Sequence, residues 1–159
     1  MIFEKIEDFL QNIKQNKRLV ALDVGRKNIG VAVSDKSWLL ATPKTTVKRK
    51  SNKIDIPEIL KLYKEADATG LIVGLPLNLN EEETDCSQYV RRFINSILEV
   101  NDIPVFFVNE AYTSAESEEL LIDNVGIGFS KTKEIVDKMS AHYILNDFFS
   151  KVKNINGSL

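Results

Sequence analysis

The spacing of the apolar runs constrains the fold more than any other feature of this sequence. Three runs near the start, at 19–22, 29–34 and 38–46, are separated by only a few residues, which requires antiparallel neighbours. Two later runs, at 71–73 and 104–108, alternate with amphipathic segments, which favours parallel strands joined by helices. The sequence therefore predicts an α/β domain with a mixed five-stranded sheet, an antiparallel meander plus parallel strands, and helices on both faces.

Apolar residues at helical spacing predict the helices. The expected ranges are 2–13, 54–66, 84–100, 115–122 and 131–149. The fourth helix is supported by a capping box, in which Thr113 is followed three residues later by Glu116. A chain of 159 residues is enough for one sizeable core and too short for two. We expect a single domain at 18–159 and an amphipathic helix within 1–17 that is appended to the domain and packs on its surface.

Composition excludes several classes of protein. The chain is 43% hydrophobic and 28% charged, which is typical of globular proteins, and no apolar run approaches the roughly 20 residues of a membrane-spanning helix. Acidic residues interrupt the apolar positions at the amino terminus, unlike a signal peptide. The single cysteine, Cys86, allows neither an internal disulfide nor a cysteine-rich metal site, which fits a reducing compartment. The expected location is the cytoplasm.

The charge of the chain is small but unevenly spread. A net charge of −2 does not by itself indicate nucleic-acid binding. A basic stretch nevertheless contains Lys44, Lys48, Arg49, Lys50 and Lys53, and an acidic run covers 81–83. A basic stretch taken alone is more often a solvated loop than a phosphate contact, so it gains weight only if other features indicate a nuclease.

Three carboxylates occupy positions where burial would be costly. Asp23 ends an apolar strand, Glu110 follows another, and Asp137 shares a helical stripe with apolar residues of the last helix. An ionised carboxylate in such a place costs several kcal/mol unless it is paired or binds a cation. The plainer alternatives are a turn residue, a solvated strand exit and an acid near a helix amino terminus.

These three carboxylates are candidates for one site. The carboxyl ends of strands lie along one edge of an α/β sheet, where Asp23 and Glu110 can meet beneath Asp137. Like charges this close require cations, and hard oxygen ligands favour Mg²⁺ or Mn²⁺. Two such ions about 4 Å apart can activate water for phosphodiester hydrolysis. We therefore predict that Asp23, Glu110 and Asp137 are both metal ligands and catalytic residues.

Four motifs follow one another in order along the chain. They are Asp-Val-Gly with Ile-Gly-Val-Ala-Val-Ser-Asp at 23–35, Val-Gly-Leu-Pro-Leu-Asn at 73–78, the segment 108–114, and Val-Asp-Lys-Met-Ser-Ala with Tyr-Ile-Leu at 136–145. In this order they resemble the YqgF (RuvX) family of pre-16S rRNA nucleases and Holliday-junction-resolvase-like proteins. The resemblance runs from about residue 19 to 149 and is specific because four motifs share one order.

The resemblance implies an RNase H-like fold and a divalent-metal nuclease that matures the 5′ end of pre-16S rRNA. Its expected partners are structured RNA and ribosomal precursor particles, and the alternative substrate is a Holliday junction in DNA. The acidic triad of the family carries over onto Asp23, Glu110 and Asp137, the same residues that the burial argument selects.

One departure from the family lies in the third motif. The family usually has Asp-Glu-Arg, whereas this chain has Asn109, Glu110 and Ala111. If the family's arginine stabilises phosphate charge, Arg26 or Lys27 is the candidate to replace it. The residues that we expect to contact substrate are Arg26, Lys27, Asn78, Thr113 and Ser114. Turn and capping roles explain Asn78, Thr113, Ser114 and Asp35 equally well.

Two other functions fit parts of this pattern. Asp-x-Gly followed by Ile-Gly-Val-Ala also resembles the first phosphate loop of actin-like ATPases, but those proteins need a second domain for which 159 residues leave no room. A non-catalytic nucleic-acid-binding module is favoured by the missing arginine and disfavoured by the three acids. Metal binding discriminates between the module and the nuclease.

Overall fold

A six-stranded mixed sheet organises the protein. The computed structural model describes residues 1–110 and 129–157, with side chains described for 1–110 and 140–157. The strands are β1 (Ile2–Phe3), β2 (Arg18–Val24), β3 (Asn28–Ser34), β4 (Ala41–Lys48), β5 (Ala68–Pro76) and β6 (Val105–Glu110). The helices are α1 (Ile6–Gln11), α2 (Asn52–Glu65), α3 (Asp85–Val100) and α5 (Phe129–Gly157). The helix predicted at 115–122 lies outside the described residues.

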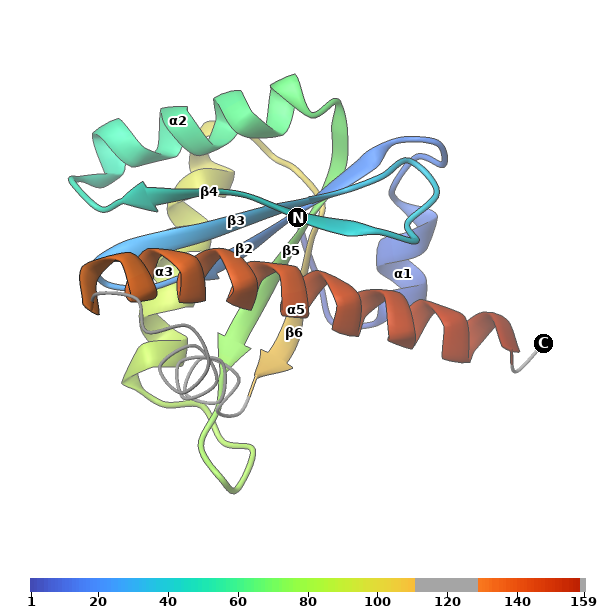
Figure 1. Ribbon diagram of the computed structural model, residues 1–159. Coiled ribbons are helices and arrows are strands. Elements are labelled where there is room, and N and C mark those ends of the chain that lie inside the picture. The colour runs from blue at the N-terminus through green and yellow to red at the C-terminus, as the bar shows by residue number, and fades with distance from the viewer. Residues whose placement is uncertain (111–128, 158–159) are drawn as a thin grey trace.

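The strand order is β1-β6-β5-β2-β3-β4 (Figure 1). Strands β2, β3 and β4 form the predicted antiparallel meander, and β5 pairs in parallel with β2 and β6. The predicted mixed sheet is confirmed. The predicted number of strands is wrong by one, because β1 adds to the outer edge of β6 with Ile2 opposite Val105 and Phe3 opposite Phe106.

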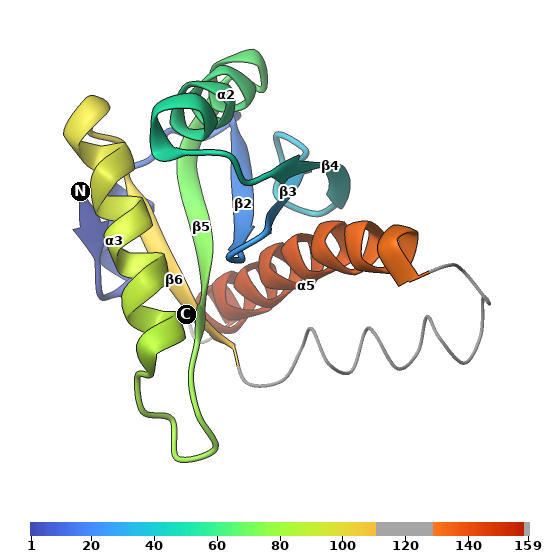
Figure 2. The same ribbon diagram turned by 90° about the vertical axis from the view of Figure 1, so that its left-hand side faces the viewer.

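The two faces of the sheet carry separate cores. Along β2, Val20, Leu22 and Val24 belong to a core under α2 and α3. Leu19 and Ala21 belong to a core under α1 and α5, since successive strand residues point to opposite faces. Figure 2 shows α2 and α3 on one side of the strands and α5 on the other. We call these sides the α2/α3 face and the α5 face, and the prediction of helices on both faces is confirmed.

The amino-terminal segment differs from the prediction. A single helix starting at Ile2 is wrong, because Ile2 and Phe3 form β1 and the helix spans only Ile6–Gln11. Phe9, on the apolar side of this helix, is fully buried in the α5-face core, while Glu7, Asp8 and Gln11 are exposed. Its ring packs edge-on against Phe148 at a centroid separation of 5.7 Å. Helical periodicity alone does not reveal that the first residues pair with a strand that follows a hundred residues later.

No helix among the described residues is long and apolar enough to cross a membrane.

Asp35 has a structural role in the turn between β3 and β4. Its carboxylate accepts hydrogen bonds from the backbone N–H groups of Leu39 at 2.8 Å and Leu40 at 3.0 Å, and from the Ser37 hydroxyl. Trp38, which was predicted to start a strand, instead adopts a left-handed φ of 58° within this turn. Because β3 carries the chain away from the β2–β3 turn, Asp35 lies at the opposite end of the sheet from Asp23. Of its two predicted roles, Asp35 therefore has the turn role.

The turn makes the stability of the fold depend on pH. Partial desolvation acts to raise the pKa of Asp35, but hydrogen bonds from Leu40, Ser37 and Leu39 outweigh it and lower the pKa from 3.8 to about 2. A carboxyl group whose pKa is lower in the folded than in the unfolded state stabilises the protein at pH values above its unfolded-state pKa. This stabilisation is lost as the pH falls through the folded-state pKa. We expect Asp35→Asn to lower the free energy of unfolding at pH 6, and the gap from wild type to shrink below about pH 4.

Urea unfolding at pH 6, 4.5 and 3 measures that gap. Glu99→Gln, which alters an exposed carboxylate on α3, is the matched control. A gap that stays constant over this range would show that the Asp35 carboxylate does not act through its charge.

Candidate active site at the carboxyl edge of the sheet

Asp23 lies near the end of β2, where it is half-buried and pairs across the ladder with Gly30. Its neighbours Leu22 and Val24 both belong to the core of the α2/α3 face. Because strand side chains alternate, Asp23 is directed to the α5 face. The sequence folds this way because a continuous apolar run fills both faces of a central strand up to Leu22.

Glu110 is the last residue of β6 and is also half-buried. It has the same parity along its strand as Phe106 and Val108, which both lie in the core of the α5 face. Its backbone carbonyl accepts a hydrogen bond of 3.0 Å from the N–H of Leu77. The structure thus brings Asp23 and Glu110 to the same face and the same edge of the sheet.

Gly74 of β5 lies between these two carboxylate positions. The register pairs Leu22 with Val73, so Gly74 follows at the level of Asp23, about 4.8 Å away across the ladder. A Cβ atom on Gly74 would lie 3.3 Å from Cγ of Glu110 and 2.5 Å from Cδ1 of Ile144 on α5. The Glu110 side chain therefore extends over β5 toward β2. Glycine is needed here because any side chain would meet both neighbours.

The third predicted ligand is described only by its backbone. Position 137 lies in α5, one helical turn before Ala141, which is fully buried against the sheet. The side chain of Asp137 and all of Thr113 and Ser114 lie outside the described residues. Among the side chains that the structure does describe, no three of the His, Cys, Asp or Glu residues gather into a group that could hold a metal ion.

The two basic residues predicted to contact substrate form the tip of the β2–β3 turn. Arg26 and Lys27 are both exposed there. The turn is closed by the N–H of Gly25, which donates to the Asn28 carbonyl at 2.9 Å. A Cβ on Gly25 would lie 2.7 Å from that oxygen, so the close approach requires glycine. Asp23 and the exposed basic pair thus lie at one edge.

A buried ion pair, which the sequence reasoning missed, supports this turn. Nε of Arg49 donates to Oδ2 of Asp55 at 2.9 Å, and the Asp55 side chain is fully buried. Nη1 and Nη2 of Arg49 donate to the Tyr89 hydroxyl at 2.9 Å and to Oδ1 of Asn52 at 2.7 Å. The backbone N–H of Arg49 donates to the Lys27 carbonyl at 2.8 Å. Arg49 is therefore a structural member of the basic stretch, not a solvated one.

Asn78 organises the loop that follows β5. Its side-chain oxygen accepts hydrogen bonds of 2.9 Å from the backbone N–H groups of both Asn80 and Glu82. The structure thus shows the turn role that was one of its two predicted roles. A contact between Asn78 and substrate stays a prediction.

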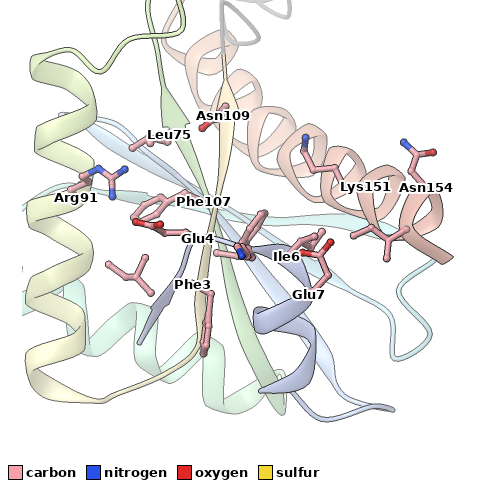
Figure 3. Close-up of a pocket in the computed structure, with 14 residues that line it drawn as sticks. Phe3, Glu4, Ile6, Glu7, Leu75, Arg91, Phe107, Asn109, Lys151 and Asn154 are labelled. Atoms are coloured by element: carbon pink, nitrogen blue, oxygen red, sulfur yellow. The ribbon is translucent and has the colours of Figure 1, made fainter. Parts of the chain in front are cut away.

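A hollow of about 680 Å³ lies elsewhere, at the outer edge of β6 (Figure 3). Charges of both signs line it, with Glu4 and Glu7 beside Arg91 and Lys151. Arg91 is already paired with Glu83 at 2.5 Å. Since β5 and β6 separate this edge from β2, the hollow is a poor candidate for chemistry that involves Asp23.

Comparison with solved structures identifies the fold. RuvC of Thermus thermophilus in complex with a Holliday junction substrate superposes with a TM-score of 0.53 over 86% of this chain and 96% of that chain. The sequence identity is 12%, so this likeness concerns the fold. The mixed sheet with helices on both faces is the RNase H-like fold of RuvC-type resolvases, as the family resemblance implied.

Comparison with sequences identifies the family. The family described as "RuvX: Holliday junction resolvase" matches residues 17–151. Relatives named "Putative pre-16S rRNA nuclease" include a Thermoanaerobacter pseudethanolicus protein, 39% identical over 86% of this chain and 99% of its own length. A relative of the same name from Ruegeria sp. is 33% identical over 99% of this chain and its whole own length. Another, from Wolbachia sp. subsp. Drosophila simulans, is 34% identical over 98% of this chain and 99% of its own length. The chain belongs to the RuvX family.

The close packing at Gly74 predicts a destabilised variant. Gly74→Ala places a methyl group 2.5 Å from Ile144, and overpacking of this kind costs about 1–3 kcal/mol. Ile144→Val removes the nearest atom and should partly restore stability in the double variant. Thermal and urea unfolding measure both effects. Gly157→Ala, where nothing lies within 4 Å, is the control, and an equal effect of the two alanines would contradict the packing argument.

The ion pair of Arg49 predicts a second, larger effect. Arg49→Ala leaves the buried Asp55 carboxylate without its cation, which should lower the free energy of unfolding by about 3–5 kcal/mol. Adding Asp55→Ala removes the unpaired charge, so the double variant should lose less than the two single variants together. Urea unfolding of the three variants completes this cycle. Strictly additive losses would mean that the pair does not act as a unit.

Proposed function

We propose that this protein is a divalent-metal-dependent nuclease that hydrolyses phosphodiester bonds in the 5′ extension of pre-16S rRNA. The observation that supports this most strongly is that Asp23 and Glu110 share one face and one edge of the sheet on either side of Gly74. Ribosomal precursor particles in the cytoplasm are the proposed setting. The names of the curated relatives favour rRNA as the substrate.

The residues present fit a magnesium or manganese site. Asp23 and Glu110 offer hard carboxylate oxygens, and Gly74, which has no side chain, leaves room over β5 for the side chains of Glu110 and Ile144. Asp137 would be the third ligand, since α5 passes over this face with Ala141 and Ile144 buried beneath it. When bound, the ions would neutralise the carboxylates and activate the phosphodiester and the attacking water.

The chain's own basic residues would orient the substrate. Arg26 and Lys27 lie three and four residues after Asp23, on a turn whose shape is fixed by Gly25 and by Arg49. Donors held in place beside the reacting phosphate stabilise charge without reorganisation. We therefore assign the role of the arginine that Ala111 replaces to Lys27, and we assign to Arg26, whose guanidinium lies over the Tyr89 ring, a contact with the substrate on the α2/α3 face. Asn78, Thr113 and Ser114 are proposed as further substrate contacts.

Resolution of a Holliday junction is the second candidate function. It is favoured by the description of the matching family and by the shared fold with RuvC. The same carboxylate site would serve either substrate, so the choice rests on substrate binding and has to be measured directly.

Cleavage assays test both candidates. The purified protein is incubated with a 5′-extended 16S rRNA precursor and, separately, with a four-way DNA junction, in Mg²⁺, Mn²⁺ or EDTA. We expect metal-dependent cleavage of the RNA. Asp23→Asn and Glu110→Gln should each reduce the rate by at least about 100-fold, since partners outside the ligand shell alone account for about 10–100-fold.

Glu99→Gln, on the exposed side of α3, is the control that should retain wild-type cleavage. Cleavage of the junction alone would favour the resolvase. Cleavage that persists in Asp23→Asn, or nucleic-acid binding without any cleavage by the wild type, would overturn the proposed nuclease site.

A further inference from the structure

A second polar hollow lies at the same edge of the sheet but on its α2/α3 face. It measures about 320 Å³ and is lined by Arg49, Asn52, Tyr89, Arg92, Phe93 and Ser96. These residues come from the loop after β4, the start of α2 and the first three turns of α3. Neither the family description nor the names of the relatives assigns a role to this place.

The hollow lies next to the proposed cleavage site. Strand β4 is parallel to β2, because both are antiparallel to β3, so the loop that carries Arg49 leaves the sheet at the edge of Asp23. Arg26 connects the two places. It is three residues from Asp23, so the two Cα atoms are at most about 11 Å apart, and its guanidinium carbon lies 4.7 Å from the centre of the Tyr89 ring.

The exposed charges around the hollow are mainly positive. Arg26, Lys50 and Arg92 are all exposed. The Asp55 carboxylate is fully buried and held by Arg49, so it adds no exposed negative charge. Two exposed acidic residues, Asp85 and Glu99, lie on the same side of α3 as Arg92, seven residues before and after it, so the three cations exceed them by one. A positive excess of this kind attracts phosphate groups.

The aromatic rings are not available to stack with bases. The Arg49 guanidinium carbon lies 4.4 Å from the centre of the Phe93 ring and 5.8 Å from that of Tyr89, and Arg26 covers Tyr89 as well. The rings hold guanidinium groups by cation–π attraction. Arg49 already donates to Asp55, Tyr89 and Asn52. The hollow therefore offers no free ring for stacking. Arg92 is the exposed cation that lines it, Arg26 lies over its Tyr89, and Lys50 follows its Arg49 in the chain.

We propose that this hollow binds the phosphate backbone of a single-stranded nucleic-acid segment that flanks the bond to be cut. The strand leaves the carboxylates on the α5 face, crosses the edge over the 25–28 turn, and reaches Arg92 on the α2/α3 face. The proposal rests on the proposed nuclease function and adds the direction of the flanking strand. It makes Arg92 a substrate-binding residue that reads charge and not sequence.

Salt dependence of binding tests this proposal. A fluorescently labelled single-stranded oligoribonucleotide is titrated with the Asp23→Asn variant in EDTA, which suppresses cleavage, at several NaCl concentrations. Loss of one phosphate contact reduces the magnitude of the slope of log K against log salt by about 0.7, which corresponds to about fivefold weaker binding near 0.1 M salt. We expect these changes for Arg92→Ala, whereas Arg92→Lys should keep the slope.

Lys61→Ala is the matched control, because Lys61 is an exposed cation near the other end of α2. It should change neither slope nor affinity. If Arg92→Ala has the slope and affinity of Lys61→Ala, the proposal is wrong. If the wild-type protein cleaves RNA but Arg92→Ala behaves like Lys61→Ala, this binding site is wrong and the proposed nuclease function stands. If the wild-type protein shows no metal-dependent cleavage, the proposed function itself is wrong.

Discussion

The placement of two carboxylates on one face at the carboxyl edge of the sheet is the constraint on which the proposed site depends. Asp23 and Glu110 are both half-buried on one face, where partial desolvation strengthens every charge interaction. Parallel pairing of β5 with both β2 and β6 fixes the separation of their strands, and Gly74 makes room over β5 for the side chains of Glu110 and Ile144. Two carboxylates on one face at one edge favour a bound cation, which is the physical basis for the metal-dependent nuclease that we propose.

The surroundings of the edge are held by interactions on the opposite face. Arg49 joins the loop after β4 to the buried Asp55 and to Tyr89, and its backbone fixes the carbonyl of Lys27. The carboxylates and the basic turn are therefore positioned by two different cores, one on each face of the sheet. A strand of nucleic acid that contacts both must cross the edge between them.

Much of the fold could be predicted from the sequence, because the meander and the alternating strands and helices are local patterns. The continuous apolar runs of β2 and β5 indicate strands buried on both faces, and α3 begins within one residue of its expected start. The register between β2 and β5, which brings Gly74 beside Asp23, is a long-range pairing that periodicity does not encode. For the same reason β1 was missed, since Ile2 and Phe3 also fit a helical pattern.

The candidate site was predicted in part. Burial cost alone selected Asp23 and Glu110, and the structure brings them to one edge. The sequence does not distinguish Arg49 from its lysine neighbours, because its structural role depends on an ion pair with Asp55. In the sequence, Asp55 has the usual position of an acidic residue in the first turn of a helix. A signal was present, since Asp55 precedes Ile59 by one helical turn and so shares its buried side.

Paramagnetic line broadening tests the central claim most directly. In ¹H–¹⁵N spectra of the ¹⁵N-labelled protein, substoichiometric Mn²⁺ should first broaden the amide signals around Asp23, Gly74 and Glu110, and Asp23→Asn should abolish this selectivity. Broadening that begins instead at the exposed acidic run 81–83, with the signals around Asp23 unchanged, would contradict the metal site on which this account depends.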